Sequence, residues 1–162
     1  MDGPVRKLRV SARLETTEML LTADEIDYNE ETGHAEARGN VAFENFQTGE
    51  KLTATRINYN LREESGTFYE IKGSAPIKVE NRPRLLMTNN PFIFQGRLAE
   101  KIKNRYILYD GFVTNCRIPK PGWRLTGPKF DIIPGERAIA YKSFFKVKRF
   151  PLLYAPVFFK SL

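Results

Sequence analysis

LTADEIDYN at residues 21–29 returns at residues 52–60 as LTATRINYN, so a pattern of Leu, Thr, Ala, Ile, Tyr and Asn recurs after 31 positions. A self-match at a fixed period is typical of stacked structural units, which bury their apolar faces against one another. The repeat therefore predicts a stack of similar units that share one core.

Each copy changes the phase of its apolar residues at the same point. Leu21 and Ala23 occupy odd positions, whereas Ile26 and Tyr28 occupy even ones, and the second copy repeats the change. A slip of one residue exchanges the two faces of a strand, so a recurring slip predicts a bulge or corner in every unit. We expect a bent strand, a glycine-bearing turn, and a return strand that ends at Gly39 or Gly73.

The rest of the chain also reads as short strands. Apolar residues alternate with a period of two, which is typical of half-buried strands, at residues 35–43, 57–61, 123–125 and 130–132. Turn signals occur at residues 29–33, 45–49, 64–66, 89–91, 110–111, 121–122 and 134–135. Weaker copies at residues 94–111 and 123–145 bring the expected number of units to four. We predict an all-β, antiparallel stack of bent-strand repeats with an apolar inner trough and open sheet edges at both ends.

Length and composition indicate the number of domains and whether a membrane-spanning or signal segment is present. The chain has 162 residues, of which 41% are hydrophobic, so we expect a single folded domain over residues 1–162. No stretch reaches the roughly 18 to 20 continuous apolar residues of a membrane-spanning helix. The start, Met1 to Pro4, lacks the apolar segment of a signal peptide, which leaves open a cytosolic protein or one whose signal has been removed.

Charge is distributed unevenly along the chain. Residues 1–80 carry ten Lys and Arg against fifteen Asp and Glu, whereas residues 81–162 carry sixteen against four, so the halves have net charges of −5 and +12. The second half also holds fourteen of the twenty aromatic residues. A basic, aromatic half indicates an anionic partner, such as nucleic acid, a phosphorylated lipid or a membrane surface.

The sequence offers little support for a catalytic or metal-binding site. His34 is the only histidine and lies beside Gly33 in an expected turn, which excludes a histidine triad or a histidine-rich metal site. A calcium loop beginning at Asp27 would need glycine at Thr32 and glutamate at Arg38. We therefore expect no enzyme, no metal and no cofactor.

The C-terminal motifs carry a resemblance. Thr114-Asn115-Cys116, then Trp123 opening a strand, then a final Pro151-x-x-Tyr154-x-Pro156-x-Phe158 closely resemble the periplasmic domain of the outer-membrane lipopolysaccharide-assembly family, also called LptD or OstA (organic solvent tolerance). The N-terminal repeat, with Ala-Asp-x-Ile-x-Tyr at residues 23–28 and Gly-Asn-Val at 39–41, resembles the domain that this family shares with the soluble bridge protein LptA.

The resemblance implies a V-shaped antiparallel jelly roll on the periplasmic side of the outer membrane. Members of the family receive lipopolysaccharide from an LptA-like bridge protein, edge to edge, and pass its acyl chains along the trough to a C-terminal β-barrel that has an LptE-like lipoprotein partner. This chain stops about where the family's barrel begins. We therefore expect either a piece of a longer protein or a relative that has no barrel. In the family, the cysteine at the position of Cys116 forms a disulfide with the barrel region, which is absent here.

The alternation argument selects the expected contacts of such a lipid. Lining residues of the trough are predicted to be Ile26, Tyr28, Val41, Phe43, Ile57, Tyr59, Phe92, Phe94, Trp123, Leu125, Phe130 and Ile132. Phosphate or membrane-surface contacts are expected at Lys142, Lys146, Lys148 and Arg149. Residues 5–14 are read either as an exposed first strand that accepts a strand from the bridge protein or as an internal strand.

Two other classes of function remain open from the sequence. One is a soluble, LptA-like bridge or adaptor that polymerises end to end. The other is a basic β-sheet module for single-stranded nucleic acid, although we expect lipopolysaccharide and not nucleic acid as the partner.

Overall fold

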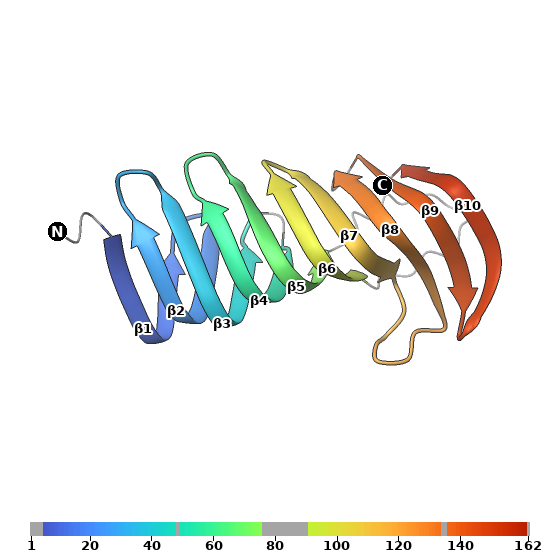
Figure 1. Ribbon diagram of the computed structural model, residues 1–162, viewed down its shortest axis with the longest axis horizontal. Helices are drawn as coiled ribbons and strands as arrows, with labels where there is room; N and C mark the ends of the chain where they lie inside the picture. Colours follow the sequence, from blue (N-terminus) through green and yellow to red (C-terminus); the bar gives the residue numbers. More distant parts are fainter. Residues whose placement is uncertain (1–4, 48, 76–90, 134–135, 162) are drawn as a thin grey trace.

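The computed structural model describes residues 5–47, 49–75, 91–133 and 136–161. Its ten strands have closely similar lengths, and each follows the previous one along the long axis of the molecule (Figure 1). The strands are β1 (Val5–Glu15), β2 (Met19–Asn29), β3 (His34–Asn45), β4 (Lys51–Asn60), β5 (Ser65–Ala75), β6 (Phe92–Ile102), β7 (Arg105–Thr114), β8 (Trp123–Ile133), β9 (Arg137–Val147) and β10 (Phe150–Ser161).

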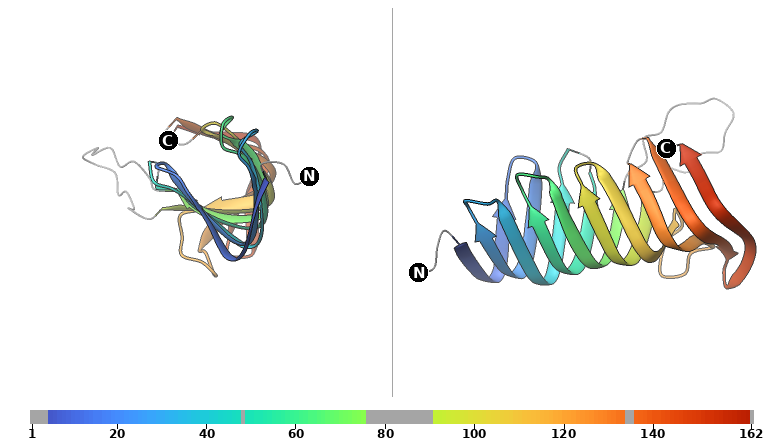
Figure 2. Two further views of the ribbon diagram at one scale, coloured as in Figure 1. Left: turned by 90° about the vertical axis from the view of Figure 1, so that its left-hand side faces the viewer. Right: turned by 45° about the horizontal axis from the view of Figure 1, so that its top comes forward.

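All ten strands belong to one antiparallel sheet in the order β1 to β10. Viewed along its long axis, the sheet is folded over on itself and leaves one side open (Figure 2). The expected all-β, bent antiparallel fold is confirmed. No helix in the described ranges is long and apolar enough to cross a membrane. Because β1 and β10 each pair with one neighbour, the described sheet has two open edges, and β1 is an edge strand and not an internal one.

Each strand bends near its middle, where the sequence changes phase. The pairing register shifts between Thr22 and Glu25 on β2 and between Arg38 and Val41 on β3, which confirms the predicted bulge. The odd-numbered strands place residues with positive φ at this point, namely Val10, Ser11, Gly39, Asn40, Glu70, Asp110 and Lys142. The bend is thus made mainly on alternate strands.

Two details of the sequence interpretation were wrong. Gly39 and Gly73 do not end their strands, because β3 continues to Asn45 and β5 to Ala75. Asp110-Gly111 is not a turn but lies inside β7, where Asp110 has a φ of 50° and forms part of the bend. The turns predicted at residues 89–90 and 134–135 lie outside the described residues.

Glycines allow neighbouring strands to approach at the bend. Gly96 pairs with Gly111, which pairs with Gly127 on the next strand. A Cβ atom on Gly111 would lie 2.0 Å from the carbonyl oxygen of Gln95, closer than any real contact. A side chain at this position would therefore push β6 and β7 apart.

The core is a row of inward side chains that crosses the sheet from strand to strand. The pairing register aligns them on one face, and each is at most 3% exposed: Ile26, Ala37, Ile57, Phe68, Ala99, Leu108, Phe130 and Ala140. Stacking the units thus buries one continuous apolar face, as the repeat predicted.

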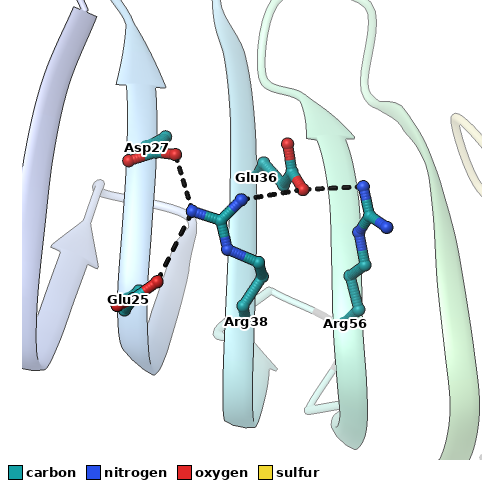
Figure 3. Close-up of polar contacts among 5 residues, drawn as sticks. All are labelled: Glu25, Asp27, Glu36, Arg38 and Arg56. Atoms are coloured by element: carbon teal, nitrogen blue, oxygen red, sulfur yellow. Dashed lines mark hydrogen bonds and ion pairs between the residues drawn. The ribbon is translucent and has the colours of Figure 1, made fainter.

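The outer face of the first strands is polar. Arg38 on β3 donates hydrogen bonds to Asp27 (2.8 Å) and Glu36 (3.1 Å), and it lies 3.5 Å from Glu25 (Figure 3). Arg56 on β4 lies 2.7 Å from the same Glu36 carboxylate. Solvated ion pairs of this kind each contribute little to stability, but together they mark a face that is turned to water.

Candidate functional site

The inner face of the bent sheet carries all twelve residues predicted to line a trough. Pairing places each of them on the same side of the sheet as the buried core row. Six are buried, namely Ile26, Val41, Phe43, Ile57, Tyr59 and Phe130, and six are half-buried, namely Tyr28, Phe92, Phe94, Trp123, Leu125 and Ile132. The inner face is therefore closed in some parts and accessible in others.

The N-terminal part of this face is filled by its own side chains. The ring of Phe43 lies 5.7 Å from that of Tyr59 and 5.9 Å from that of Phe68, centroid to centroid. Phe43 and Phe68 are 2% and 0% exposed. Phe68 is therefore enclosed, whereas Phe43 and Tyr59 also line a cavity between the two arms of the sheet, which are the halves of the strands on either side of the bend.

A second inward row becomes more accessible toward the C-terminus. Register aligns it from β2 to β10 through Leu21, Phe43, Leu52, Gly73, Phe94, Val113, Leu125, Phe145 and Leu153. Its first three members are at most 2% exposed, those from β5 to β9 are half-buried, and Leu153 is 69% exposed. The same apolar row is thus a closed core at one end and an accessible groove at the other.

A polar contact joins the two arms over the closed part. Glu50, in the turn between β3 and β4, accepts a hydrogen bond of 2.5 Å from the hydroxyl of Tyr106 at the start of β7. Both residues are buried, at 4% and 7% exposed. We call this contact, together with Lys101 and Tyr59 beside it, the clasp.

Lys101 lies among the aromatic rings of the clasp. Its Nζ atom lies 5.9 Å from the ring centroid of Tyr59 and 5.5 Å from that of Tyr106, and it donates a hydrogen bond to the carbonyl oxygen of Lys103. A cavity of about 440 Å³ opens beside the clasp between the two arms. Its walls include Glu18 on one arm and Glu64 on the other.

Burial changes the proton affinity of the clasp. It lowers the pKa of Lys101, although the charges of Glu50 and Glu64 act in the opposite direction. Burial and the charges of Glu64 and Glu18 raise the pKa of Tyr59 to about 12, and burial together with Glu50 raises that of Tyr106. The clasp therefore favours neutral phenols.

The phenol of Tyr59 makes stability depend on alkaline pH. Because its pKa rises from 10.0 in the unfolded chain to about 12 in the fold, its contribution is complete below pH 10 and is lost as pH increases toward about 12. We expect Tyr59→Phe to reduce the fall in the free energy of unfolding over this window, with the remaining fall due in part to Tyr106. Urea unfolding at pH 8 and at several values from 10 to 12 measures this, with pH 8 as the control. An unchanged slope would contradict the assignment.

Cys116 and Trp123 lie together at the accessible end. The hydroxyl of Thr114 donates to the carbonyl oxygen of Trp123 at 2.6 Å and accepts from the backbone N–H of Cys116 at 3.0 Å. A hydrogen bond from the backbone of Trp123 is the main reason why the pKa of the free Cys116 thiol is lowered. Trp123 stacks on Phe145 at 5.6 Å, so the single tryptophan reports on the inner face.

The four predicted basic contacts lie on β9 and in the turn after it. Lys142 is exposed at the bend, Lys146 is half-buried opposite Arg124, and Lys148 and Arg149 are exposed between β9 and β10. Within the described ranges, no group of three His, Cys, Asp or Glu side chains is placed to hold a metal ion.

Sequence reasoning missed three features of the site. The Glu50–Tyr106 contact joins residues 56 positions apart and has no local pattern. The Nζ atom of Lys160 on β10 lies 5.2 Å from the ring centroid of Phe92 on β6, a second contact between the arms. The exposure of β10 had a visible signal, because its apolar residues do not alternate with polar ones.

Comparison with known proteins adds a likeness of fold. No protein-family model matches the chain, and none of the curated proteins does. Among solved structures, it is similar to LptH from Pseudomonas aeruginosa, described as the LptA homologous periplasmic component of the conserved lipopolysaccharide transport device. The two share 16% sequence identity, with a TM-score of 0.48, over 99% of this chain and 96% of LptH. The likeness is one of fold and assigns no role to any residue.

Proposed function

We propose that this protein binds the acyl chains of lipopolysaccharide on the inner face of β6 to β10 and passes the lipid along the sheet in the periplasm. One observation carries the proposal: the inward apolar row is closed at Phe43 and Leu52, half-buried from Phe94 to Phe145, and exposed at Leu153. An apolar surface that remains accessible in a folded protein is suited to an apolar ligand or partner.

The charge of the accessible half suits an amphiphile with an anionic head. Residues 81–162 carry a net charge of +12 and include the strands of the accessible groove. Lipid A combines several acyl chains with phosphate groups. The acyl chains suit the apolar groove, and the phosphates suit the Lys and Arg side chains of this half of the chain. Each buried methylene contributes roughly 0.8 kcal/mol, spread over similar contacts. The lipid is thus held firmly and is still able to slide.

The groove explains how the lipid is bound but not why it would move in one direction. Transfer is proposed to be passive, by movement of the acyl chains over many similar apolar contacts. Direction would come from the supply of lipid at one end and its removal at the other.

Two roles within this transport process remain proposals. The C-terminal motifs favour the receiving domain of the outer-membrane assembly protein, in which Cys116 would pair with the barrel. The alternative is an LptA-like periplasmic bridge, the class of protein to which LptH belongs. Open edges at both β1 and β10 suit a bridge that pairs on two sides.

Edge pairing through β1 is part of both roles, but Val10 is a poor site to test it. Simple alternation made Val10 an apolar member of the strand, whereas the bulge leaves it 87% exposed with a φ of 60°. Proline requires a φ near −65°, so it would distort the strand itself at this position. A crosslink between β1 and the partner strand is the sounder test.

Fluorescence of Trp123 tests the proposed function directly. Acyl chains against the Trp123–Phe145 stack should displace water and shift the emission of the single tryptophan to shorter wavelength. Lipid A should produce a saturable shift, whereas the deacylated lipopolysaccharide core, which keeps the sugars and phosphates, should not. An equal response to the core, or displacement of lipid A by single-stranded DNA, would reject acyl-chain binding on this face.

A further inference from the structure

The outer face of β9 and β10 is apolar, unlike the outer face of the first strands. Tyr154 contacts Phe144 at a ring separation of 4.9 Å, and the two lie opposite each other in the β9–β10 ladder. Farther along the same face, Val157 pairs with Tyr141 and Phe159 with Ile139. We call these six residues, Ile139, Tyr141, Phe144, Tyr154, Val157 and Phe159, the outer apolar strip.

The strip is exposed where the fold would be expected to present polar groups. Tyr154, Val157 and Phe159 are 54%, 60% and 61% exposed, and Phe144 is 43% exposed. The outer face of β2 to β4 instead carries the ion pairs of Arg38 and Arg56 (Figure 3). A strand that is apolar on both faces has the composition of one that is covered on both faces.

The surroundings of the strip are mainly basic, and the acidic neighbour Asp131, which pairs with Ile139, is buried and ion-paired with Arg105. From Arg137 to Leu162 the sequence has six Lys and Arg residues and no Asp or Glu. Lys146 pairs with Pro151 beside the strip, and Lys148 and Arg149 are exposed in the turn at the end of the two strands. Lys160 does not belong to the basic residues around the strip, because its side chain contacts Phe92 on the inner face of the sheet.

Charge disfavours a second copy that meets this face with either of its edge strands. A second copy placed with its β10 against this β10 would bring two basic segments together. A second copy placed with its β1 there would do the same, because β1 carries Arg6, Lys7, Arg9 and Arg13 against one acidic residue, Glu15. An anionic bilayer is complementary to the basic turn, and aromatic side chains beside Lys and Arg are typical of surfaces that lie in the membrane interface.

We propose that the outer apolar strip, with Lys146, Lys148 and Arg149, binds the surface of an anionic lipid bilayer. The inner groove remains free in this arrangement, because the strip lies on the opposite face of the sheet. This surface is distinct from the lipopolysaccharide groove and does not depend on it.

Vesicle sedimentation with the full chain tests the proposal. Vesicles of phosphatidylcholine and phosphatidylglycerol, free of lipopolysaccharide, should bind the protein at low salt, and vesicles of phosphatidylcholine alone should bind it at least tenfold less. The double variant Tyr154→Ser/Phe159→Ser should lower binding to the anionic vesicles at least tenfold. The reversal Lys148→Glu/Arg149→Glu should do the same.

A matched control is present in the same strand. Leu153 and Phe158 pair with Phe145 and Ala140, so they lie on the inner face, and they are 69% and 42% exposed. Leu153→Ser/Phe158→Ser should keep binding to the anionic vesicles. An equal loss of vesicle binding in Tyr154→Ser/Phe159→Ser and in Leu153→Ser/Phe158→Ser would overturn the proposal. Vesicle binding that does not depend on vesicle charge would also overturn it, and so would a loss that accompanies a change in oligomeric state.

The Trp123 response to lipid A separates this proposal from the proposed function. The apolar outer variant Tyr154→Ser/Phe159→Ser should retain the response in full, which also shows that it is folded. Loss of vesicle binding with that response intact supports the bilayer surface. Retention of vesicle binding in the outer variants refutes it, whatever the lipid A result.

Discussion

Replacing Phe68 by alanine is expected to lower the free energy of unfolding by about 3 to 5 kcal/mol, the range typical of a fully buried phenylalanine. Phe68 is 0% exposed, and its ring contacts those of Phe43 at 5.9 Å and Tyr59 at 6.4 Å. Removal of the ring leaves a cavity in the closed part of the inner face, where the β-strands on either side are held by their own pairing and cannot collapse onto it.

Urea unfolding followed by far-ultraviolet circular dichroism measures this loss. Phe159→Ala is the control, because Phe159 is 61% exposed and its replacement should change the free energy of unfolding by less than about 0.5 kcal/mol. If the two variants lost similar stability, the N-terminal inner face would not be the closed core described above.

Replacing Leu125 by aspartate is expected to weaken lipid A binding by about 50-fold. Leu125 is half-buried between Val113 and Phe145 in the accessible part of the inward row. Loss of contact with about three methylenes costs roughly 2.4 kcal/mol, which corresponds to this factor. A carboxylate at this position also repels the lipid phosphates, so the estimate is a lower bound.

The neighbouring residue supplies the control for this variant. Thr126 is half-buried on the other face of β8, where its hydroxyl donates to the carbonyl oxygen of Phe144. Thr126→Asp adds the same charge one position away and should bind lipid A within about twofold of the wild type. Equal weakening by both variants would indicate a general charge effect and would remove Leu125 from the groove.

The sequence predicted the architecture well, because the features that determine it are local and repeated. The two copies at residues 21–29 and 52–60 predicted stacked hairpins, and the change of phase between Ala23 and Ile26 predicted the bulge. Asp110-Gly111 misled the interpretation, since this dipeptide is a common turn signal and the positive φ of Asp110 serves a bend within β7.

The division of the inner face into a closed and an accessible part was not predictable from the sequence. Alternation treats Phe43 and Leu125 alike, although one is 2% exposed and the other is half-buried. The difference depends on contacts between the arms, such as Glu50 with Tyr106, that only the folded chain brings together. The apolar run of β10 was visible, but its two faces are distinguished only by the register with β9.

Site-specific photocrosslinking to lipopolysaccharide tests the central claim most directly. A photoreactive residue at Leu125, on the inner face of β8, should form an adduct with lipopolysaccharide, and the same residue at Thr126, on the outer face, should not. Phe43 and Phe130 are poorer positions, because both are buried and a bulky probe would disturb the core. An adduct at Leu125 alone is the predicted result. An adduct at Thr126 alone, or none at Leu125 in folded protein whose Trp123 still responds to lipid A, would contradict lipid passage along the inner face.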